Sequence, residues 1–359
     1  MILDCHKDSE KLSPTNVLKL APLLRTAGFY AYLHLTVMEI HQILSASDAA
    51  SLVEKEKAFV DSHPDYTVSM RRYILSARSQ KDELLCNSSF NEGLSAVSFV
   101  IQPILGRDSI AVWIYLVKDC AVEFLWSTNL CSHAPGSENQ TREILQAYEN
   151  DLAEKNLTIS DNCVRTWFFV DDIDRNYSGV VIGRRENFEE QGMTKATHYL
   201  ASTGICGGAV VQDTIVQMDA LAIKGEFSQH YLYAPANFNP THEYGVTFER
   251  GVVVKFGGES HILISGTASI NNKGEIVHPG DTSAQTLRMW DNVEALLHEA
   301  SSSWKDVRMM IVYLRNAEDH DVVSALFSER FGSDIPYVIT LAPVCRPGWL
   351  IEMECIAIR

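Results

Sequence analysis

The sequence lacks a long hydrophobic run, an excess of positive charge and closely spaced cysteines, and each absence excludes a class of protein. No apolar stretch reaches the roughly 18 residues that span a bilayer, and the N-terminus lacks the basic and apolar segments of a signal peptide. A formal net charge of −16 disfavours binding to nucleic acid or to membrane surfaces, which requires basic patches. The eight scattered cysteines are typical of reduced thiols. We therefore expect a soluble cytoplasmic protein.

Motifs for metal ions, phosphates and nucleophilic serines are also missing. The 12 histidines show no His-Glu-x-x-His spacing and the cysteines show no Cys-x-x-Cys pair. The glycine-rich residues 204–208 lack the Lys-Ser/Thr pair of a phosphate-binding loop, and no serine lies in a Gly-x-Ser-x-Gly turn. We therefore expect neither a metal site nor an organic cofactor.

What the chain does contain is a repeat. The apolar, β-prone octet at residues 351–358 closely resembles the octet at residues 216–223, and each has a carboxylate at its fourth position. At the second position the later octet has Glu352 and the earlier one has Gln217. This pattern predicts a duplicated domain in which only the later copy kept an acid at that point of a strand.

The repeat extends beyond the octets. Val164-Arg165 and Val307-Arg308 each begin a predicted strand that follows a predicted helix and precedes an acidic turn. Helix, strand, acidic turn, helix and terminal strand therefore recur in the same order. The alternative is that two unrelated units look alike by chance, because such patterns are common. A chain of 359 residues is long enough for two domains.

An ordered set of residues in the second half resembles the Rid/YjgF family over residues 261–359. The matching residues are Ser265-Gly266, Gly280-Asp281, Gln285-Thr286, Asn292-Val293, Val307, Tyr313-Leu314, Pro336 and Ile351-Glu352-Met353-Glu354. The resemblance implies an α+β domain of chorismate-mutase-like fold, a mixed sheet packed against two helices, with sites in clefts between domains or subunits. Imine-hydrolysing members carry an arginine two residues after the proline, where this chain has Val338, which argues against that activity.

The longer stretch from about residue 90 to 359 is similar to the chorismatase family. Residues 265–270 (Ser-Gly-Thr-Ala-Ser-Ile), Val344-Cys345-Arg346, Tyr244-Gly245 and Phe248-Glu249-Arg250 match that family's order. The resemblance implies two tandem Rid/YjgF-like domains, a degenerate one at residues 65–230 and a catalytic one at residues 231–359. Residues 1–64 are expected to form an N-terminal helical extension, because residues 46–60 have amphipathic spacing.

Glu352 has the position of a general acid. In a strand, side chains alternate, so Glu352 and Glu354 share one face at a separation of about 7 Å. A carboxyl group in this apolar strand has a raised pKa unless it is paired, and it then donates a proton near neutral pH. The alternative is a salt bridge with Arg308 or Arg346 inside the sheet.

The resemblance also implies a substrate pocket. Chorismate carries two carboxylates, and arginine binds carboxylate through two parallel hydrogen bonds. The candidate substrate-binding residues are Arg250, Arg346, Tyr244, Thr267 and Ala268. Cys345, next to Arg346, is a second candidate catalytic residue that would help select the product, although buried cysteines more often act as small apolar side chains.

Three functions remain open from the sequence. The first is a chorismatase-like enzyme that cleaves the enolpyruvyl ether of chorismate to pyruvate plus a dihydroxycyclohexadiene carboxylate or a hydroxybenzoate. The second is a Rid-type deaminase of 2-imino acids or enamines, and the third is a non-catalytic ligand-binding protein. All three take a small molecule as partner, and the Rid resemblance implies a homotrimer. Convergence of Glu352, Arg250 and Arg346 on one cleft would favour the enzymes.

Overall fold

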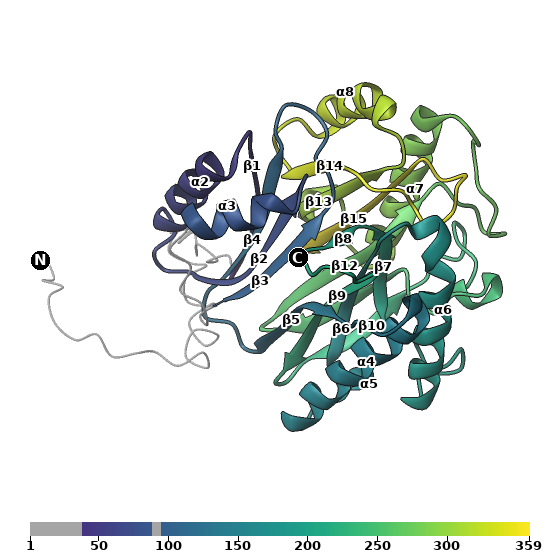
Figure 1. Ribbon diagram of the computed structural model, residues 1–359. Coiled ribbons are helices and arrows are strands. Elements are labelled where there is room, and N and C mark those ends of the chain that lie inside the picture. Colours follow the sequence, from purple (N-terminus) through teal and green to yellow (C-terminus); the bar gives the residue numbers. More distant parts are fainter. Residues whose placement is uncertain (1–37, 88–94) are drawn as a thin grey trace, which may run out of the picture. The chain divides into compact units, whose positions relative to one another are not determined.

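Three mixed β-sheets carry the fold, and one strand arrangement recurs in all of them (Figure 1). The computed structural model describes residues 38–87 and 95–359, and residues 38–359 pack as one unit. The sheets are named here the N-terminal, middle and C-terminal sheets.

The C-terminal sheet has six strands in the order β10-β11-β12-β15-β13-β14. These are β10 (Ser228–Leu232), β11 (Gly251–Phe256), β12 (Glu259–Ala268), β13 (Val307–Leu314), β14 (Tyr337–Leu341) and β15 (Ile351–Ile358), with helices α7 (Thr282–Glu299) and α8 (His320–Phe331). The short 3-10 helices η2 (Thr241–Tyr244), η3 (Trp304–Asp306) and η4 (Ala317–Asp319) lie between these elements.

The middle and N-terminal sheets are built from earlier parts of the chain. The middle sheet, in the order β5-β9-β6-β7, contains β5 (Glu123–Cys131), β6 (Cys163–Val170), β7 (Ala201–Cys206) and β9 (Val216–Lys224), with helices α4 (Gly136–Glu154), α5 (Ile159–Asn162) and α6 (Ile173–Glu190). The N-terminal sheet, in the order β1-β4-β2-β3-β8, contains β1 (Glu39–Ala46), β2 (Thr67–Leu75), β3 (Ala96–Ile101), β4 (Ile110–Val117) and β8 (Gly208–Ala209), with helices α2 (Ala49–Asp61) and α3 (Ser79–Asn87).

Each sheet has a central strand between two antiparallel neighbours, one of which pairs in parallel with the next strand. The central strands are β4, β9 and β15. Because these strands have a partner on both sides and are covered on both faces, they are apolar and buried along almost their whole length. The predicted α+β fold with tandem Rid-like units is confirmed.

A third unit was not predicted from the sequence. Residues 39–117 repeat the same strand order, and strand β1 lies inside the expected helical extension. Residues 1–37 of that extension lie outside the described residues, whereas α2 agrees with the helix predicted at residues 46–60. The boundary at residue 64 falls within the N-terminal sheet and the one at residue 230 falls within β10. How the chain divides into domains stays a prediction.

The two octets that indicated the duplication occupy equivalent registers. Gln217 in β9 pairs with Phe169 of β6, the residue before the last of that strand, and Glu352 in β15 pairs with Tyr313, the residue before the last of β13. In β4 the equivalent residue is Ala111, which pairs with Ile74 in the same way. Only the C-terminal sheet therefore has an acid at this register position.

The match between Val164-Arg165 and Val307-Arg308 was wrong by one residue. Arg165 pairs with Leu221, at the sixth position of its octet, whereas the sixth position of the later octet pairs with Met309. A bulge omits Arg308 from the register between Val307 and Met309. Arg165 and Arg308 are therefore not equivalent, although both follow a valine.

Candidate active site

A cavity of about 360 Å³ lies between the middle and C-terminal sheets. The middle sheet and its helix α6 supply one wall, and β12, β15 and the loops before β11 and β15 supply the other. Its lining is Tyr177, Ser178, Val181, Ile182, Arg184, Ser202, Thr203, Gly204, Tyr244, Gly245, Val246, Phe248, Arg250, Gly266, Ala268, Ile270, Cys345, Arg346, Trp349 and Glu352. Segments far apart in the sequence therefore meet at this cavity.

The cavity brings together six of the seven candidate residues. Those on its wall are Glu352, Cys345, Arg250, Arg346, Tyr244 and Ala268. Thr267, the seventh candidate, does not line this cavity. It pairs with Met353 on the opposite face of the sheet from Glu352, and its hydroxyl donates to the Ser265 carbonyl at 2.9 Å. The roles of all seven residues stay predictions.

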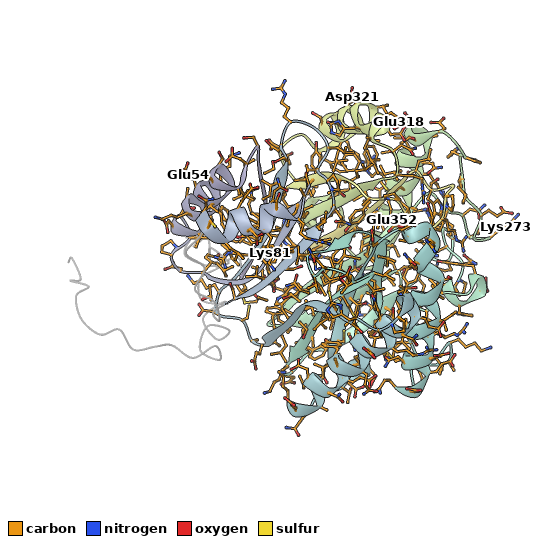
Figure 2. The ribbon with its side chains drawn as sticks, viewed as in Figure 1. Glu54, Lys81, Lys273, Glu318, Asp321 and Glu352 are labelled. Atoms are coloured by element: carbon orange, nitrogen blue, oxygen red, sulfur yellow. The ribbon has the colours of Figure 1, made fainter. Side chains whose placement is uncertain are left out.

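Glu352 is buried without a partner. The strand β15 places it inside the fold, with 5% of its surface exposed, whereas Lys273 and Glu318 lie at the periphery (Figure 2). Within residues 38–87 and 95–359 its carboxyl group makes no hydrogen bond or ion pair. The salt bridge to Arg308 or Arg346, the alternative considered from the sequence, is not formed there. Glu352 is instead available to a molecule in the cavity.

Two effects raise the pKa of Glu352 to about 8. Burial is the larger effect and the negative charge of Glu354 is the second, while Arg250 and Arg165 act in the opposite direction. A carboxyl group with such a pKa is mostly protonated at neutral pH, and a protonated carboxyl group can donate a proton.

Gly266 leaves room for this carboxyl group. A Cβ atom at residue 266 would lie 2.2 Å from Oε1 of Glu352 and 2.9 Å from its carboxyl carbon. Any side chain there would displace the carboxyl group. Glycine at position 266 of β12 is therefore needed for the Glu352 carboxyl group to keep its position.

Arginine side chains supply positive charge around Glu352. Arg250 donates from Nη2 to the Tyr244 hydroxyl at 2.6 Å, and its buried Nε has no hydrogen-bond partner. Because Tyr244 accepts this bond, its own proton is free for a ligand. Arg346 lies over the rings of Tyr244 and Trp349, with 4.6 and 5.0 Å between the guanidinium carbon and the ring centroids.

Arg184 is a third cation that the sequence did not single out as a site residue. It reaches the cavity from α6 with 1% of its surface exposed, and its Nε and Nη2 atoms have no hydrogen-bond partner. The signal was the pair Gly183-Arg184 in a segment that matches the chorismatase order. A buried arginine with unsatisfied donors is costly in an empty cavity and is satisfied by an anion.

The Cys345 thiol has a strongly raised pKa. Burial raises its pKa to about 12 and the nearby Glu352 acts in the same direction, whereas Arg346 and Arg184 oppose it. The thiolate is the reactive form of cysteine, so this pKa disfavours a nucleophilic role for Cys345 at neutral pH.

Imine-hydrolysing Rid proteins carry an arginine at the position of Val338, and in this chain Val338 lies outside the cavity. Val338 pairs with Ile311 in the C-terminal sheet, and the equivalent pair in the middle sheet is Thr203 with Trp167. Thr203 lines the cavity and Val338 does not. Thr203, which occupies the equivalent register position and does line the cavity, is also not an arginine.

Neither a membrane-spanning helix nor a metal-binding cluster is found within residues 38–87 and 95–359. No helix there is long and apolar enough to cross a membrane. No group of three or more His, Cys, Asp or Glu residues in those ranges is arranged to hold a metal ion. The seven cysteines of the described part are all free thiols.

The fold is that of a chorismatase. A solved chorismatase crystal structure superposes with a TM-score of 0.64 at 18% sequence identity, covering 89% of this chain and 98% of that protein. At this identity the likeness establishes the fold alone.

The family follows from sequence comparison of the C-terminal sheet. The model of the family described as endoribonuclease L-PSP matches residues 252–359. A RutC family protein from Pyrococcus abyssi is 37% identical over 100 residues, which are 27% of this chain and 78% of that protein. The 3-aminoacrylate deaminase RutC from Acinetobacter baylyi is 29% identical over 98 residues, or 27% and 77% of the two chains. The chain belongs to this endoribonuclease L-PSP, or RutC, family.

Proposed function

We propose that the protein is a chorismatase-like enzyme that cleaves the enolpyruvyl ether of chorismate without a cofactor. One observation carries the proposal. Glu352, which has a raised pKa and no partner among the described residues, lines the same cavity as Arg184, Arg250 and Arg346. The chorismatase fold of the described part supports it.

The charges of the cavity match a dicarboxylate. A chain with a formal net charge of −16 would repel such an anion unless the pocket itself were positive. Arg184 and Arg250 have buried N–H groups without partners, and these would each donate to a carboxylate. Arg346 and the Tyr244 hydroxyl would hold the second carboxylate or a ring hydroxyl.

The reaction would begin with a proton transfer from Glu352. Its O–H group protonates the methylene carbon of the enolpyruvyl group, which leaves an oxocarbenium ion at the ether carbon. Water adds to that carbon and returns a proton to Glu352. The resulting hemiketal loses its ring oxygen as an alcohol and releases pyruvate plus a dihydroxycyclohexadiene carboxylate. A hydroxybenzoate is the other product considered, and the volume and thiol of Cys345 would influence which forms.

The test is pyruvate release from chorismate by the purified protein, with Glu352→Gln as the matched variant. We expect pyruvate in amounts equal to the chorismate consumed, and a loss of at least about 100-fold in the variant, the usual contribution of a general acid. Equal rates with and without Glu352 would disprove the proposal. Chromatography of the ring product would distinguish the diol from the hydroxybenzoate.

A Rid-type deaminase of 2-imino acids or enamines is the second candidate, because the chain resembles a 3-aminoacrylate deaminase over its C-terminal sheet. It would accelerate ammonia release from freshly made iminopyruvate. Neither Thr203 nor Val338 supplies the arginine expected for that activity. A non-catalytic ligand-binding protein is the third candidate, and it would be stabilised by chorismate and leave it unchanged.

The expected homotrimer and the cytoplasmic location stay predictions. Three related sheets already occur within one chain, so the contacts of a trimer of single-sheet subunits have possible counterparts inside this protein. Sedimentation of the purified protein would separate a monomer from a trimer.

A further inference from the structure

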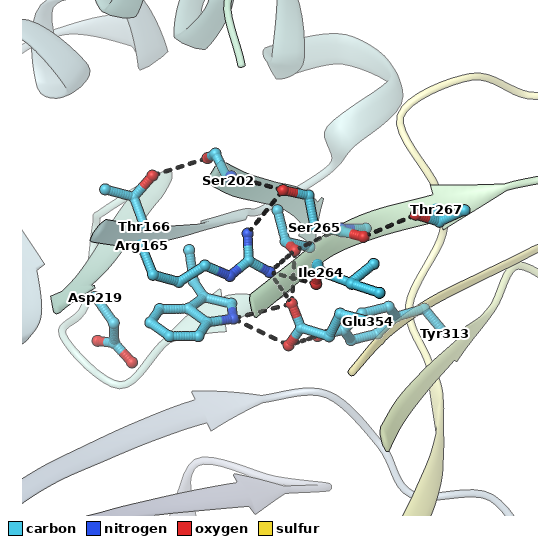
Figure 3. A network of polar contacts seen from close by, with 12 residues as sticks. Arg165, Thr166, Ser202, Asp219, Ile264, Ser265, Thr267, Tyr313 and Glu354 are labelled. Atoms are coloured by element: carbon cyan, nitrogen blue, oxygen red, sulfur yellow. Dashed lines mark hydrogen bonds and ion pairs between the residues drawn. The ribbon is translucent and has the colours of Figure 1, made fainter. Parts of the chain in front are cut away.

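Glu354, two residues after Glu352, differs from it because four side chains donate hydrogen bonds to its carboxyl group. Its Oε2 atom accepts from Arg165 Nη2 at 2.5 Å, from Thr203 Oγ1 at 2.6 Å and from Trp167 Nε1 at 2.9 Å. Its Oε1 atom accepts from the Tyr313 hydroxyl at 2.9 Å. Arginine and tryptophan side chains only donate hydrogen bonds, so this set of partners selects the carboxylate form of Glu354 (Figure 3).

Most of these donors come from the neighbouring sheet. Arg165 and Trp167 lie on β6 and Thr203 lies on β7, whereas Glu354 lies on β15. Arg165 and Glu354 are 2% and 5% exposed, so their ion pair is shielded from solvent. Breaking such a pair is costly, because the loss of either charge would leave the other buried and unpaired.

We propose that Glu354 is a positioning residue whose fixed negative charge keeps Glu352 in its protonated, proton-donating form. This inference rests on the proposed role of Glu352 as the proton donor. Alternate residues of a strand lie about 7 Å apart on one face, and a like charge at that distance in a partly shielded interior shifts a titration by about one to two units. Burial then supplies the larger part of the effect on Glu352, and the charge of Glu354 adds to it. Among the described residues Glu354 has four hydrogen-bonding partners and Glu352 has none.

The fold contains a matched control for this proposal. Asp219 occupies in β9 the register position of Glu354 in β15. Its Oδ2 atom accepts from Arg72 at 3.0 Å and from Ser98, and these two residues hold the register positions of Trp167 and Thr203. Asp219 is fully buried, but it does not contribute to the raised pKa of Glu352. Its removal therefore disrupts a similar ion pair and leaves the charge near Glu352 unchanged.

The experiment is a titration of Glu352 by NMR, with ¹³C in the glutamate carboxyl groups and Glu352→Gln to identify its signal. In Glu354→Gln we expect the midpoint of Glu352 to fall by about one to two pH units. In Asp219→Asn we expect no change. An unchanged midpoint in Glu354→Gln, or an equal fall in both variants, would overturn the proposal.

A second variant allows the proposal to be tested if Glu354→Gln does not fold. The double variant Arg165→Met/Glu354→Gln removes both charges and leaves none unpaired, an exchange that proteins often tolerate. Because the effect of Glu354 on Glu352 is larger than the opposing effect of Arg165, we expect a smaller fall in the midpoint than in the single variant. A rise in the midpoint would contradict the proposal.

The NMR midpoint needs no substrate, so it separates the two proposals. If chorismate is not cleaved while the midpoint falls as expected, the proposed function fails and the control of Glu352 by Glu354 stands. If chorismate is cleaved, the upper pH limit of kcat in Glu354→Gln should fall together with the NMR midpoint, whereas a merely structural role would lower kcat at every pH.

Discussion

Gly266 lies where a side chain would collide with the Glu352 carboxyl group, so its substitution is a direct test at the scale of one residue. In Gly266→Ala we expect pyruvate release from chorismate to fall by about 100-fold, the cost of displacing a reacting group by about 1 Å. The matched control is Gly208→Ala in β8, where the added carbon makes ordinary contacts of 3.4 Å or more. Circular dichroism melting should show both variants folded. Full activity in Gly266→Ala would show that the carboxyl position is unimportant.

The pH dependence of the reaction follows from the raised pKa of Glu352. A general acid must be protonated, so kcat should be constant below about pH 8 and fall tenfold per unit above it. The measurement is kcat for pyruvate release across this range. The residual activity of Glu352→Gln should not show this decrease in kcat above about pH 8. A rate that instead rises through pH 8 would make Glu352 a general base.

The presence of Glu352, Arg250 and Arg346 on one cavity wall was predictable from the sequence, because their local motifs occur in the order of the family. Arg184 was not predictable as a site residue, since its role depends on how far α6 lies from the C-terminal sheet. The position of Thr267 outside the cavity was not predictable for a different reason. A bulge in β12 between Ile264 and Thr267 changes which side chains face the cavity, and strand alternation alone does not reveal it.

At the scale of elements, Gln217 of β9 occupies the register position of Glu352 and has a structural contact of its own. Gln217 is 1% exposed, and its Nε2 atom donates to the Phe99 carbonyl at 2.9 Å. Glu352, at the same register, faces an open cavity. The earlier octet therefore uses its second position to join two sheets.

Gln217→Glu should destabilise the protein and add no activity. A carboxylate does not donate a hydrogen bond, so it would face the Phe99 carbonyl as a second acceptor in a buried place. We expect a loss of about 1–3 kcal/mol in the free energy of unfolding, measured with urea. The control is Gln146→Glu on the exposed side of α4, which should change little. Wild-type stability of Gln217→Glu would contradict this account of β9.

The repeat of helix and strand order was predictable from the octets, whereas the third unit was not. Its central strand β4 has Ala111 and Trp113 at the register positions of Glu352 and Glu354, so the acidic signature is missing. Only hydrogen-bond registers reveal that it is equivalent. The one-residue error at Arg165 has a similar origin, because the bulge beside Arg308 has no mark in the sequence.

At the scale of the whole described part, Glu39 joins the first sheet to the last. Its carboxyl group lies 3.1 Å from Nδ1 of His261 in β12. Burial by itself would raise the pKa of Glu39, but the interactions of its carboxyl group with the neighbouring His261 and His41 outweigh it and lower the pKa to about 2. An acid with a depressed folded pKa stabilises the fold above its unfolded value of 4.5 and loses this contribution as the pH falls towards 2.

Glu39→Gln should therefore be less stable than the wild type at neutral pH, and the difference should shrink as the pH falls from about 5 to about 2. Thermal unfolding at several pH values measures it. Glu54→Gln, on the exposed face of α2, is the matched control and should follow the wild type (Figure 2). A constant difference at every pH would assign the effect to packing.

The three related sheets lie in one polypeptide, and this has a consequence for how the protein can change. In an assembly of identical subunits every substitution is made at all equivalent places at once. Here Ala111, Gln217 and Glu352 occupy one register position and are encoded separately. Two of them were free to acquire structural roles while the third kept its acid. We therefore expect one chorismate molecule to bind per chain, and not three.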